Sequence, residues 1–510
     1  MSGSRLRDHL LAIPVGACAV LAFSPFDLWP VFLLVCIAVF LLMRGLSPGQ
    51  AAWRGWCLGV GFYGAGVSWV YVSIHNFGGA PVSLAFVLTT LLVMALALMF
   101  TAPQFALYRW LCQCVHSEGG WPPVLLFGAV WVLFEWVRGW FLTGFPWFYA
   151  GYALIDTPLA SWAPVIGVPG LSLLLILLAG GLAQYLYYRH DRTLLAILTG
   201  IVILALLSIP LRTIQWTRPV DGQTLSFAVV QADVALDLKW SPKHLDDMIA
   251  TYLRLSRPFW NRDIIIWPEN AIPALYQNIN ALVDQLDASG KATRTSLVFG
   301  VPWYENGRFY NSIVSLGAGS GHYFKQKLVP FGEYVPFESV LRGLIALFDL
   351  PASSFSSGSD NQAPLQVAGH PVAAFICYEA VYPDLVAAMV RDTGFLITIS
   401  DDSWFGASIG PFQHFQMARM RALETGRYMI RSTNGGVNAL IDEKGRVISQ
   451  FAQRQAGVLD GELPVMTGNT PFMRFASGPV LALCLLLLLA SLQPWRFRHR
   501  ASDPLWRKQG

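Results

Sequence analysis

Long apolar runs fill the first 210 residues of this chain and then stop, and this pattern restricts the fold more than any other feature. Each run is close to the roughly 20 residues that a helix needs to cross a hydrocarbon core. Only 13% of the 510 residues are charged, about half the share in a soluble protein. The sequence therefore predicts a membrane protein. Seven spans are expected in this part, at about 9–25, 29–43, 56–75, 82–108, 122–138, 164–187 and 193–210.

The rest of the sequence has a different character. Between Leu225 and Glu462 charged residues return, strand patterns alternate with amphipathic helices, and no apolar run is long enough to span. A last apolar run, Pro479 to Leu492, predicts an eighth span. We therefore expect three parts: residues 1–220 with seven membrane helices, an α/β domain over 221–465, and residues 466–510 with the last helix and a basic tail.

Arginines in the short loops predict the orientation, because cytoplasmic loops carry an excess of basic residues. The loops on the opposite side carry almost none, so both termini are expected in the cytoplasm and the α/β domain outside it. An uncleaved first helix is preferred to a signal peptide, because no small-residue cleavage site follows the first run. The arginines that set this orientation are Arg5, Arg7, Arg44, Arg54, Arg109, Arg189, Arg192, Arg496, Arg498 and Arg500.

Two function classes fit the sequence poorly. The net charge of +4 is small and dispersed, and no basic block is interleaved with aromatic residues, which argues against nucleic acid as a partner. A transporter with an accessory domain is the alternative without catalysis. The spans show no inverted repeat or paired broken helices, and this disfavours it.

One cysteine stands apart from the other six. Cys377 alone lies in the predicted outer domain, where an oxidising compartment makes an unpaired thiol a liability. It follows the apolar run VAAFI and precedes Tyr378 and Glu379. A cysteine at a strand-to-helix turn projects its sulfur from the end of a sheet, beside a backbone N–H that could stabilise an oxyanion. We favour a nucleophile, with a small buried hydrophobe as the alternative.

A thiol needs a base and a cation to become an efficient nucleophile. Glu269 ends the apolar strand in DIIIWPEN, where desolvation would raise its pKa toward that of a general base; the alternative is a helix cap. Lys325 and Lys327 share one face of a predicted alternating strand, either as an inward cation or as a solvated edge. A Cys-His hydrolase is a rival, since His414 lies 37 residues after Cys377. No signature reveals an asparagine or aspartate partner for this histidine.

Other charged residues have open roles. Glu135 and Arg138 are three apart on the fifth predicted span and could pair on one helix face, while an ionisable residue in a span is also a functional candidate. Four arginines on a helix pattern invite a phosphate-binding interpretation, although structural or solvated roles are favoured. These are Arg419, Arg421, Arg427 and Arg431.

Several of these segments together resemble a known family. WPE with Glu269, YFKQKLVPFGE with Lys325 and ICYE with Cys377 are about 50 residues apart in that order and resemble the Glu-Lys-Cys triad of the nitrilase superfamily. Other motifs are similar to those of the bacterial apolipoprotein N-acyltransferases. They are LKW at 238–240, PFGEYVP at 330–336, SDDSWFG at 400–406, QHFQMARMRALETGR at 413–427, STNGGV at 432–437 and RGWFLTGFPW at 138–147.

This resemblance implies a fold and a set of roles. The outer domain should be an αββα sandwich of the nitrilase type. Cys377 should be the nucleophile and Glu269 the general base. Lys325 should be the cation that stabilises the oxyanion, and it is preferred to Lys327 because it stands eight residues before Glu333. Supporting residues near the lysine or at the entrance of the site should be Glu333, Tyr378, Glu379 and Trp240.

The resemblance also implies a reaction. An acyl chain leaves the sn-1 position of a phospholipid, typically phosphatidylethanolamine, and forms a thioester on Cys377. The α-amino group of the N-terminal S-diacylglyceryl-cysteine of an apolipoprotein then attacks the thioester. No metal or diffusible cofactor is expected, and the location would be the bacterial inner membrane with the catalytic domain in the periplasm. A membrane-anchored amidase acting on a small soluble molecule shares the triad and stays an alternative.

Overall fold

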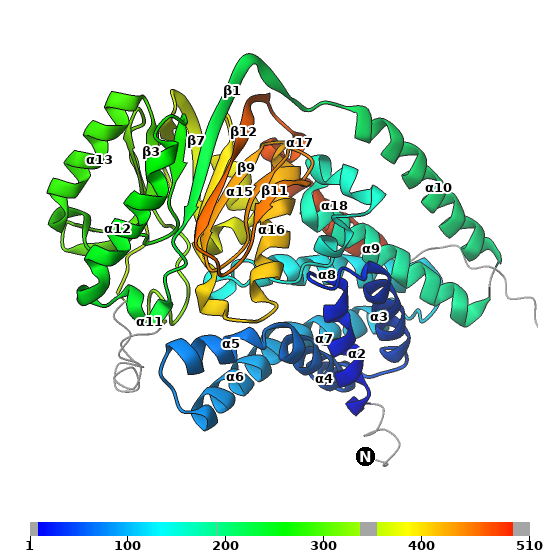
Figure 1. Cartoon of the computed structure of the whole chain (residues 1–510). Coiled ribbons are helices and arrows are strands. Elements are labelled where there is room, and N and C mark those ends of the chain that lie inside the picture. Colours follow the sequence, from blue (N-terminus) through cyan, green and yellow to red (C-terminus); the bar gives the residue numbers. More distant parts are fainter. Residues whose placement is uncertain (1–8, 190, 337–353, 493–510) are drawn as a thin grey trace, which may run out of the picture.

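The computed structural model describes residues 9–189, 191–336 and 354–492, in which an α-helical region adjoins a sandwich of two sheets (Figure 1). The first sheet has the strand order β12-β1-β2-β3-β4-β5. Strands β1, β2 and β3 are parallel, and the other neighbours pair antiparallel. The bounds are β1 Thr217–Gln231, β2 Ile264–Ile266, β3 Ser296–Glu305, β4 Arg308–Gly317, β5 His322–Phe324 and β12 Gly457–Gly468.

The second sheet has the order β11-β10-β9-β8-β7-β6. Here β7, β8 and β9 are parallel, so both sheets carry their parallel strands in the middle. Such strands are buried on both faces and are apolar throughout, as in Ile264–Ile266. The bounds are β6 Leu365–Val367, β7 His370–Ile376, β8 Leu396–Asp401, β9 Met429–Asn434, β10 Asn438–Ile441 and β11 Val447–Phe451.

Apolar side chains join the sheets and their covering helices. The inner faces meet through residues such as Phe227 and Ile266 on one sheet and Ile376 and Ile399 on the other. Each outer face packs against two helices. The predicted αββα sandwich is therefore confirmed. The helices are α12 (Leu245–Ser256) and α13 (Asn280–Thr293) on the first sheet, and α15 (Pro383–Met389) and α16 (Gly410–Thr425) on the second.

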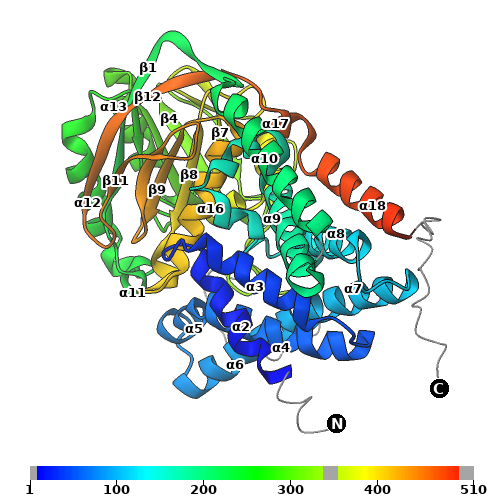
Figure 2. The same ribbon diagram turned by 90° about the vertical axis from the view of Figure 1, so that its right-hand side faces the viewer.

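The helical region precedes the sandwich in the chain, and α18 returns to it afterwards (Figure 2). The last helix packs against α8 and α9 through Val480 and Cys484, which contact Ala129, Val132 and Leu173. The helices are α2 Ala12–Cys18, α3 Trp29–Leu42, α4 Pro48–Gly66, α5 Trp69–Val72, α6 Val82–Leu96, α7 Ala102–Cys114, α8 Trp121–Arg138, α9 Ala163–Tyr188, α10 Asp191–Thr213 and α18 Gly478–Leu492.

Three helices among the described residues have the length and composition to cross a membrane: Val82–Cys114, Pro158–Tyr188 and Leu194–Thr213. A fourth results if Pro48–Gly66 and Trp69–Phe77, which are bent by 54°, form one span. The other apolar helices that meet the composition criterion are shorter. Eight spans are thus more than helix length alone supports. The arginines predicted to flank the first and last spans, Arg5, Arg7, Arg496, Arg498 and Arg500, lie outside the described residues.

The third predicted span, 56–75, differs most from the structure. Helix α4 begins earlier, because Ser47 and Gln50 form a capping box that satisfies the first backbone N–H groups. It also ends earlier, at Gly66, and the chain bends before it resumes as α5. Apolar residues continue through this break, so hydropathy alone does not locate it.

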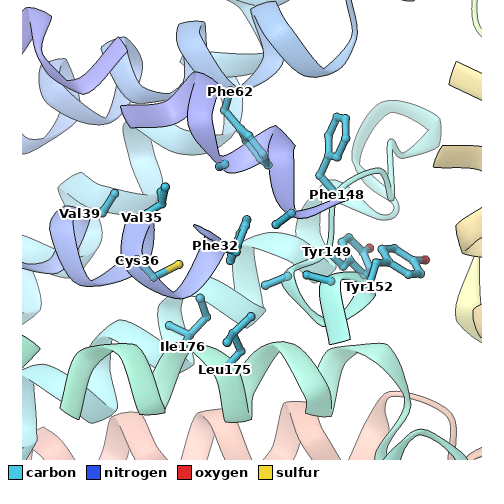
Figure 3. Packing of buried hydrophobic residues seen from close by; sticks show 14 of the residues in the cluster. Phe32, Val35, Cys36, Val39, Phe62, Phe148, Tyr149, Tyr152, Leu175 and Ile176 are labelled. Carbon is cyan, nitrogen blue, oxygen red and sulfur yellow. The ribbon is translucent and has the colours of Figure 1, made fainter. Parts of the chain in front are cut away.

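The helical region and the sandwich share one apolar cluster. Figure 3 shows Phe32 of α3 close to Leu175 and Ile176 of α9. The same cluster extends into the sandwich, where it includes Tyr378 beside the end of β7 and Met420 of α16. Helix α16 thus packs on its own sheet with one face and on α9 with another.

Helix α9 is broken where it meets the sandwich. Gly167 has a φ of 62°, which a residue with a Cβ rarely adopts, and Pro169 follows it inside the helix. The break leaves the N–H of Val168 free to donate to Glu424 Oε1 of α16, at 2.6 Å. A Cβ added at Gly167 would lie 2.2 Å from the ring of Phe472 in α17 (Pro471–Phe475).

We expect Gly167→Ala to destabilise the protein by about 1–3 kcal/mol, through backbone strain and the contact with Phe472. Thermal unfolding of the detergent-solubilised protein should show a lower midpoint. Gly200→Ala in α10 is the matched control, because nothing lies within 4 Å of its added Cβ and φ is unremarkable there. Equal midpoints for the two variants would contradict this account of the break.

Candidate active site

Cys377 lies where β7 leaves the second sheet. It is the first residue of a short 3-10 turn, Cys377–Val381, and has a φ of 51°. The preceding strand lies between β6 and β8, so the turn leaves the sheet at the carboxyl end of parallel strands. That edge is where open α/β sheets place their ligand sites. The thiol is free and the residue is half-buried, in the strand-to-turn position that the sequence predicts.

A buried lysine lies between two carboxylates beside this turn. Lys325 Nζ lies 2.8 Å from Glu333 Oε2 and 3.5 Å from Glu269 Oε1, and the lysine side chain is 1% exposed. Asn311 Nδ2 donates to Glu269 Oε1 and to Glu333 Oε1, each at 2.7 Å. The second oxygen of Glu269 accepts from the N–H of Asp401 at 2.9 Å. Glu269 therefore serves this cluster and does not cap a helix.

The charges in this cluster shift one another. Burial raises the pKa of Glu269, with Glu333 adding to the rise and Lys325 opposing it. Burial also raises the pKa of Cys377, again with Lys325 opposing. For Lys325, burial alone would lower the pKa, but the two carboxylates raise it well above its usual value. These shifts favour a protonated thiol and a charged ammonium group, and they increase the basicity of the Glu269 carboxylate.

The structure corrects one expectation about the lysines. The predicted alternating strand through Lys325 and Lys327 is wrong, because β5 ends at Phe324. Lys325 is buried in the cluster, whereas Lys327 is partly exposed and lies 5.8 Å from the centre of the Tyr382 ring. The two ammonium groups do not share a face.

Glu379 explains why the strand ends there. Its Oε1 accepts from the N–H groups of Gln326 (2.6 Å) and Lys327 (3.2 Å) and from the hydroxyl of Tyr323 (2.7 Å). Its Oε2 accepts from the N–H of Ile376 at 2.8 Å. Burial raises the pKa of Glu379 to about 7, although these donors oppose the rise. This carboxylate ties the segment that carries the lysine to the strand that carries the cysteine.

The two remaining predicted residues are Tyr378 and Trp240. The Tyr378 hydroxyl donates to the carbonyl of Gly144 in the helical region at 2.8 Å, and its ring is nearly parallel to that of Trp147. Trp240 is half-buried at the end of the short helix α11 (Leu236–Lys239). The roles suggested for these two side chains stay predictions.

Sequence reasoning missed several residues of the cluster. Lys239 is buried and its Nζ donates to the carbonyl of Glu269 at 2.8 Å and to Asp401 Oδ2. Asn311 on β4 joins both carboxylates. The motifs LKW and SDDSWFG pointed to two of these segments. Which residue of each motif faces the site depends on pairing between distant strands, and one sequence does not show that.

His414 does have an aspartate partner, contrary to the sequence analysis. Its Nδ1 lies 3.1 Å from Asp402 Oδ1, and its Nε2 lies 3.0 Å from the carbonyl oxygen of Cys377. The ring therefore bonds to the backbone of the cysteine. This arrangement does not support the Cys-His hydrolase, in which the imidazole must bond to the sulfur.

The four arginines of the phosphate interpretation all have protein partners. Two pair with carboxylates of the sandwich, one with a carboxylate of the helical region and one with carbonyl oxygens. A structural role accounts for each of them. The pairs are Arg419 with Asp156 (2.5 Å), Arg421 with Glu424 (2.9 Å), Arg427 with the carbonyl of Thr393 (2.8 Å) and Arg431 with Asp402 (2.7 Å).

Glu135 and Arg138 bind separate partners. Glu135 Oε1 accepts from Trp131 Nε1 at 3.0 Å and from the N–H of Ala150 at 2.7 Å. Arg138 Nη1 donates to the hydroxyl of Tyr63 at 2.7 Å. Both side chains are buried and connect α8 to neighbouring segments of the helical region.

Comparison with known proteins covers nearly the whole chain. The family model described as Apolipoprotein N-acyltransferase N-terminal domain matches residues 15–181, and that described as Carbon-nitrogen hydrolase matches residues 227–471. An apolipoprotein N-acyltransferase of Pseudomonas syringae pv. tomato is 45% identical over 488 residues, covering 94% of this chain and 95% of its own. The protein of that name from Vibrio vulnificus is 40% identical over 507 residues, covering 97% and 98%.

The matches cover both the helical region and the sandwich. The first family model lies within the helical region, and the second spans the sandwich together with the lysine, carboxylates and cysteine described above. The two relatives cover 94% and 97% of this chain, so their similarity includes both regions. The chain therefore belongs to the apolipoprotein N-acyltransferase family, enzymes that combine a helical membrane region with a carbon-nitrogen hydrolase sandwich.

Proposed function

We propose that this enzyme moves an acyl chain from the sn-1 position of a phospholipid of the phosphatidylethanolamine type, through a thioester on Cys377, to the N-terminal S-diacylglyceryl-cysteine of an apolipoprotein. The observation that carries this proposal is the buried group of Glu269, Lys325 and Cys377 beside the helical region. The name shared by its relatives supports the acceptor. The donor and the covalent route rest on the chemistry of the site.

The first half of the reaction acylates the cysteine. Because burial keeps the thiol protonated, Glu269 removes the proton as the sulfur attacks the ester carbonyl. Lys325 stabilises the negative charge that develops on the carbonyl oxygen. The S–C bond forms and the C–O bond to glycerol breaks. Glu269 then returns its proton to the departing glycerol oxygen, and the lysophospholipid leaves.

The second half transfers the chain to nitrogen. The neutral α-amino group of the acceptor attacks the thioester carbonyl, and Lys325 again stabilises the oxyanion. The N–C bond forms and the C–S bond breaks. Glu269 accepts the proton lost by the amine and passes it to the departing sulfur, which regenerates the cysteine thiol and the carboxylate. In this scheme Glu333 and Glu379 orient the lysine, while Tyr378 and Trp240 line the entrance.

A membrane location suits both substrates. Each exposed CH₂ would cost about 0.8 kcal/mol in water, so a site at the bilayer surface avoids extracting a whole chain. We propose eight spans and three parts, at 1–220, 221–465 and 466–510. The sandwich would lie on the periplasmic side of the bacterial inner membrane, with both termini in the cytoplasm.

We expect Cys377→Ala to abolish acyl transfer, because every other cysteine of the described structure lies in the helical region. Wild-type enzyme incubated with phosphatidylethanolamine vesicles should gain one acyl chain on Cys377. Mass spectrometry should detect it, and hydroxylamine should remove it. Cys114→Ala, at an exposed cysteine of α7, is the control and should retain activity. Active enzyme whose Cys377 stays unmodified at every time point would rule out the covalent route.

The acceptor separates the transferase from the anchored amidase. Acylated enzyme mixed with a peptide that begins with S-diacylglyceryl-cysteine should yield a product with a third, amide-linked chain. Peptide fragmentation would locate that chain on the α-amino nitrogen. The same peptide with an acetylated N-terminus is the control and should remain unchanged. Hydrolysis of small amides with no triacylated peptide would favour the amidase instead.

The pH dependence of thioester formation should report on Glu269. A general base must be ionised, so the rate should fall as pH drops through the pKa of Glu269, which lies above its ordinary value. The charge of Glu333 contributes to that rise. Glu333→Gln should therefore move the acidic limb of the rate profile to lower pH, whatever its effect on the maximal rate. Glu305→Gln, at an exposed carboxylate, should leave the limb in place. A limb that moves to higher pH in Glu333→Gln would contradict the assignment.

A further inference from the structure

A second cluster of charged side chains contacts the Cys377 turn through His414, and the proposed reaction does not use it. Asp402, His414 and Arg431 are each no more than 1% exposed. Asp402 directly follows β8, His414 belongs to α16 and Arg431 belongs to β9. Burying three ionisable side chains costs free energy unless each forms hydrogen bonds or ion pairs. Here these bonds form a chain that ends at the carbonyl of Cys377.

The orientation of the imidazole is determined by its neighbours. A carbonyl oxygen only accepts, so His414 Nε2 carries a hydrogen and donates it to the carbonyl of Cys377 at 3.0 Å. On its other side, Nδ1 faces Asp402 Oδ1 at 3.1 Å and Arg431 Nη2 at 3.0 Å. Arg431 also donates to Asp402 Oδ2 at 2.7 Å. Whichever of these groups Nδ1 bonds to, Nε2 remains a donor.

The same carboxylate is also held by a neighbouring hydroxyl group. Ser400 donates its hydroxyl hydrogen to Asp402 Oδ1 at 2.6 Å. Burial opposes ionisation of Asp402, but Arg431 and His414 lower its pKa well below the ordinary value. An ionised Asp402 is thus held by Ser400 and Arg431 while it faces the ring that donates to the carbonyl of Cys377.

The backbone of Cys377 needs such support. Its φ of 51° lies in the left-handed region. This conformation costs free energy in a residue with a Cβ, so it persists only where surrounding contacts hold it in place. Rotation of this backbone would swing the sulfur away from Glu269 and Lys325. A hydrogen bond to the carbonyl of the same residue restrains that rotation directly.

We propose that His414, held by Asp402 and Arg431, is a positioning residue that fixes the backbone of Cys377 so that its thiol faces the general base. The identity of the acyl donor and acceptor rests on the proposed function, but the positioning of the thiol does not. His414 touches no reacting atom in this scheme and acts only through the cysteine.

The helical region contributes to this arrangement. The ring of Trp147 lies over the His414 imidazole at 6.1 Å with an interplanar angle of 29°. Its Nε1 donates to Gln413, the adjacent residue of α16, at 2.8 Å, and Gln413 donates to the carbonyl of Gly66 at the end of α4. The orientation of the nucleophile is thereby connected to the packing of the helical region on α16.

The test uses full-length enzyme in detergent and two variants of one residue. His414→Leu removes the donor, whereas His414→Gln retains an N–H at similar reach. The first measurement is the rate of Cys377 alkylation by iodoacetamide, followed by mass spectrometry of the cysteine peptide. We expect about a tenfold loss for His414→Leu and recovery to within about threefold for His414→Gln, in line with one hydrogen bond. In thioester formation from phosphatidylethanolamine vesicles, kcat should fall while KM is unchanged.

Gln416→Leu is the matched control. Gln416 is a buried polar residue on the same helix, but it contacts Ser24 and Asp27 of the helical region. Its loss should leave the alkylation rate within about twofold of wild type. Asp402→Asn keeps the shape of the side chain and should slow alkylation as much as His414→Leu does. It replaces the leucine variant in the test if that variant does not fold.

Three outcomes would overturn the proposal. The first is a wild-type rate of Cys377 alkylation in His414→Leu or, where that variant does not fold, in Asp402→Asn. The others are an equal loss of alkylation rate in His414→Leu and Gln416→Leu, and no recovery of that rate in His414→Gln. The proposed function fails separately. If wild-type enzyme forms no thioester while alkylation still follows the expected order of variants, the acyl route is wrong and the positioning role stands.

Discussion

The ammonium group of Lys325 is the charge around which the rest of the site is arranged. A buried cation is tolerated only when its partners remain in place, because removing one leaves an uncompensated charge. Here the partners, Glu269 and Glu333, come from separate segments, and Asn311 bridges them from β4. The first sheet must therefore be in register before the lysine can be buried. Folding and assembly of the site are the same event for these residues.

The active site also depends on contacts between the sandwich and the helical region. Tyr378 follows the nucleophile directly and donates to the carbonyl of Gly144, while Trp147 lies against His414. The segment that joins α8 to α9 thus contacts the residues on both sides of Cys377 in space. A soluble member of the same superfamily would need other groups for these contacts. In this chain the helical region is part of the support for the active site as well as a membrane anchor.

Much of this arrangement is predictable where the signal is local. Glu269 and Cys377 each follow an apolar strand, and that short-range pattern placed both at the ends of strands. The αββα architecture came from a family resemblance. Asn311 and the aspartate partner of His414 are not predictable in this way, because their roles arise from pairing between strands and helices far apart in the chain. The predicted limits of the third span were wrong for a related reason. Hydropathy describes how apolar a segment is, whereas the start of α4 depends on the cap at Ser47.

The broken helix α9 has a consequence for how substrates reach the site. If the sandwich lifted away from the helices, Val168 would lose the acceptor of its amide hydrogen, and Glu424 would be left with only Arg421. An amide without an acceptor is especially unfavourable next to lipid. This bond therefore favours an interface that stays closed. For the proposed lipid substrates, access around the rim of the interface would preserve the bond, whereas a hinged opening of the whole sandwich would break it.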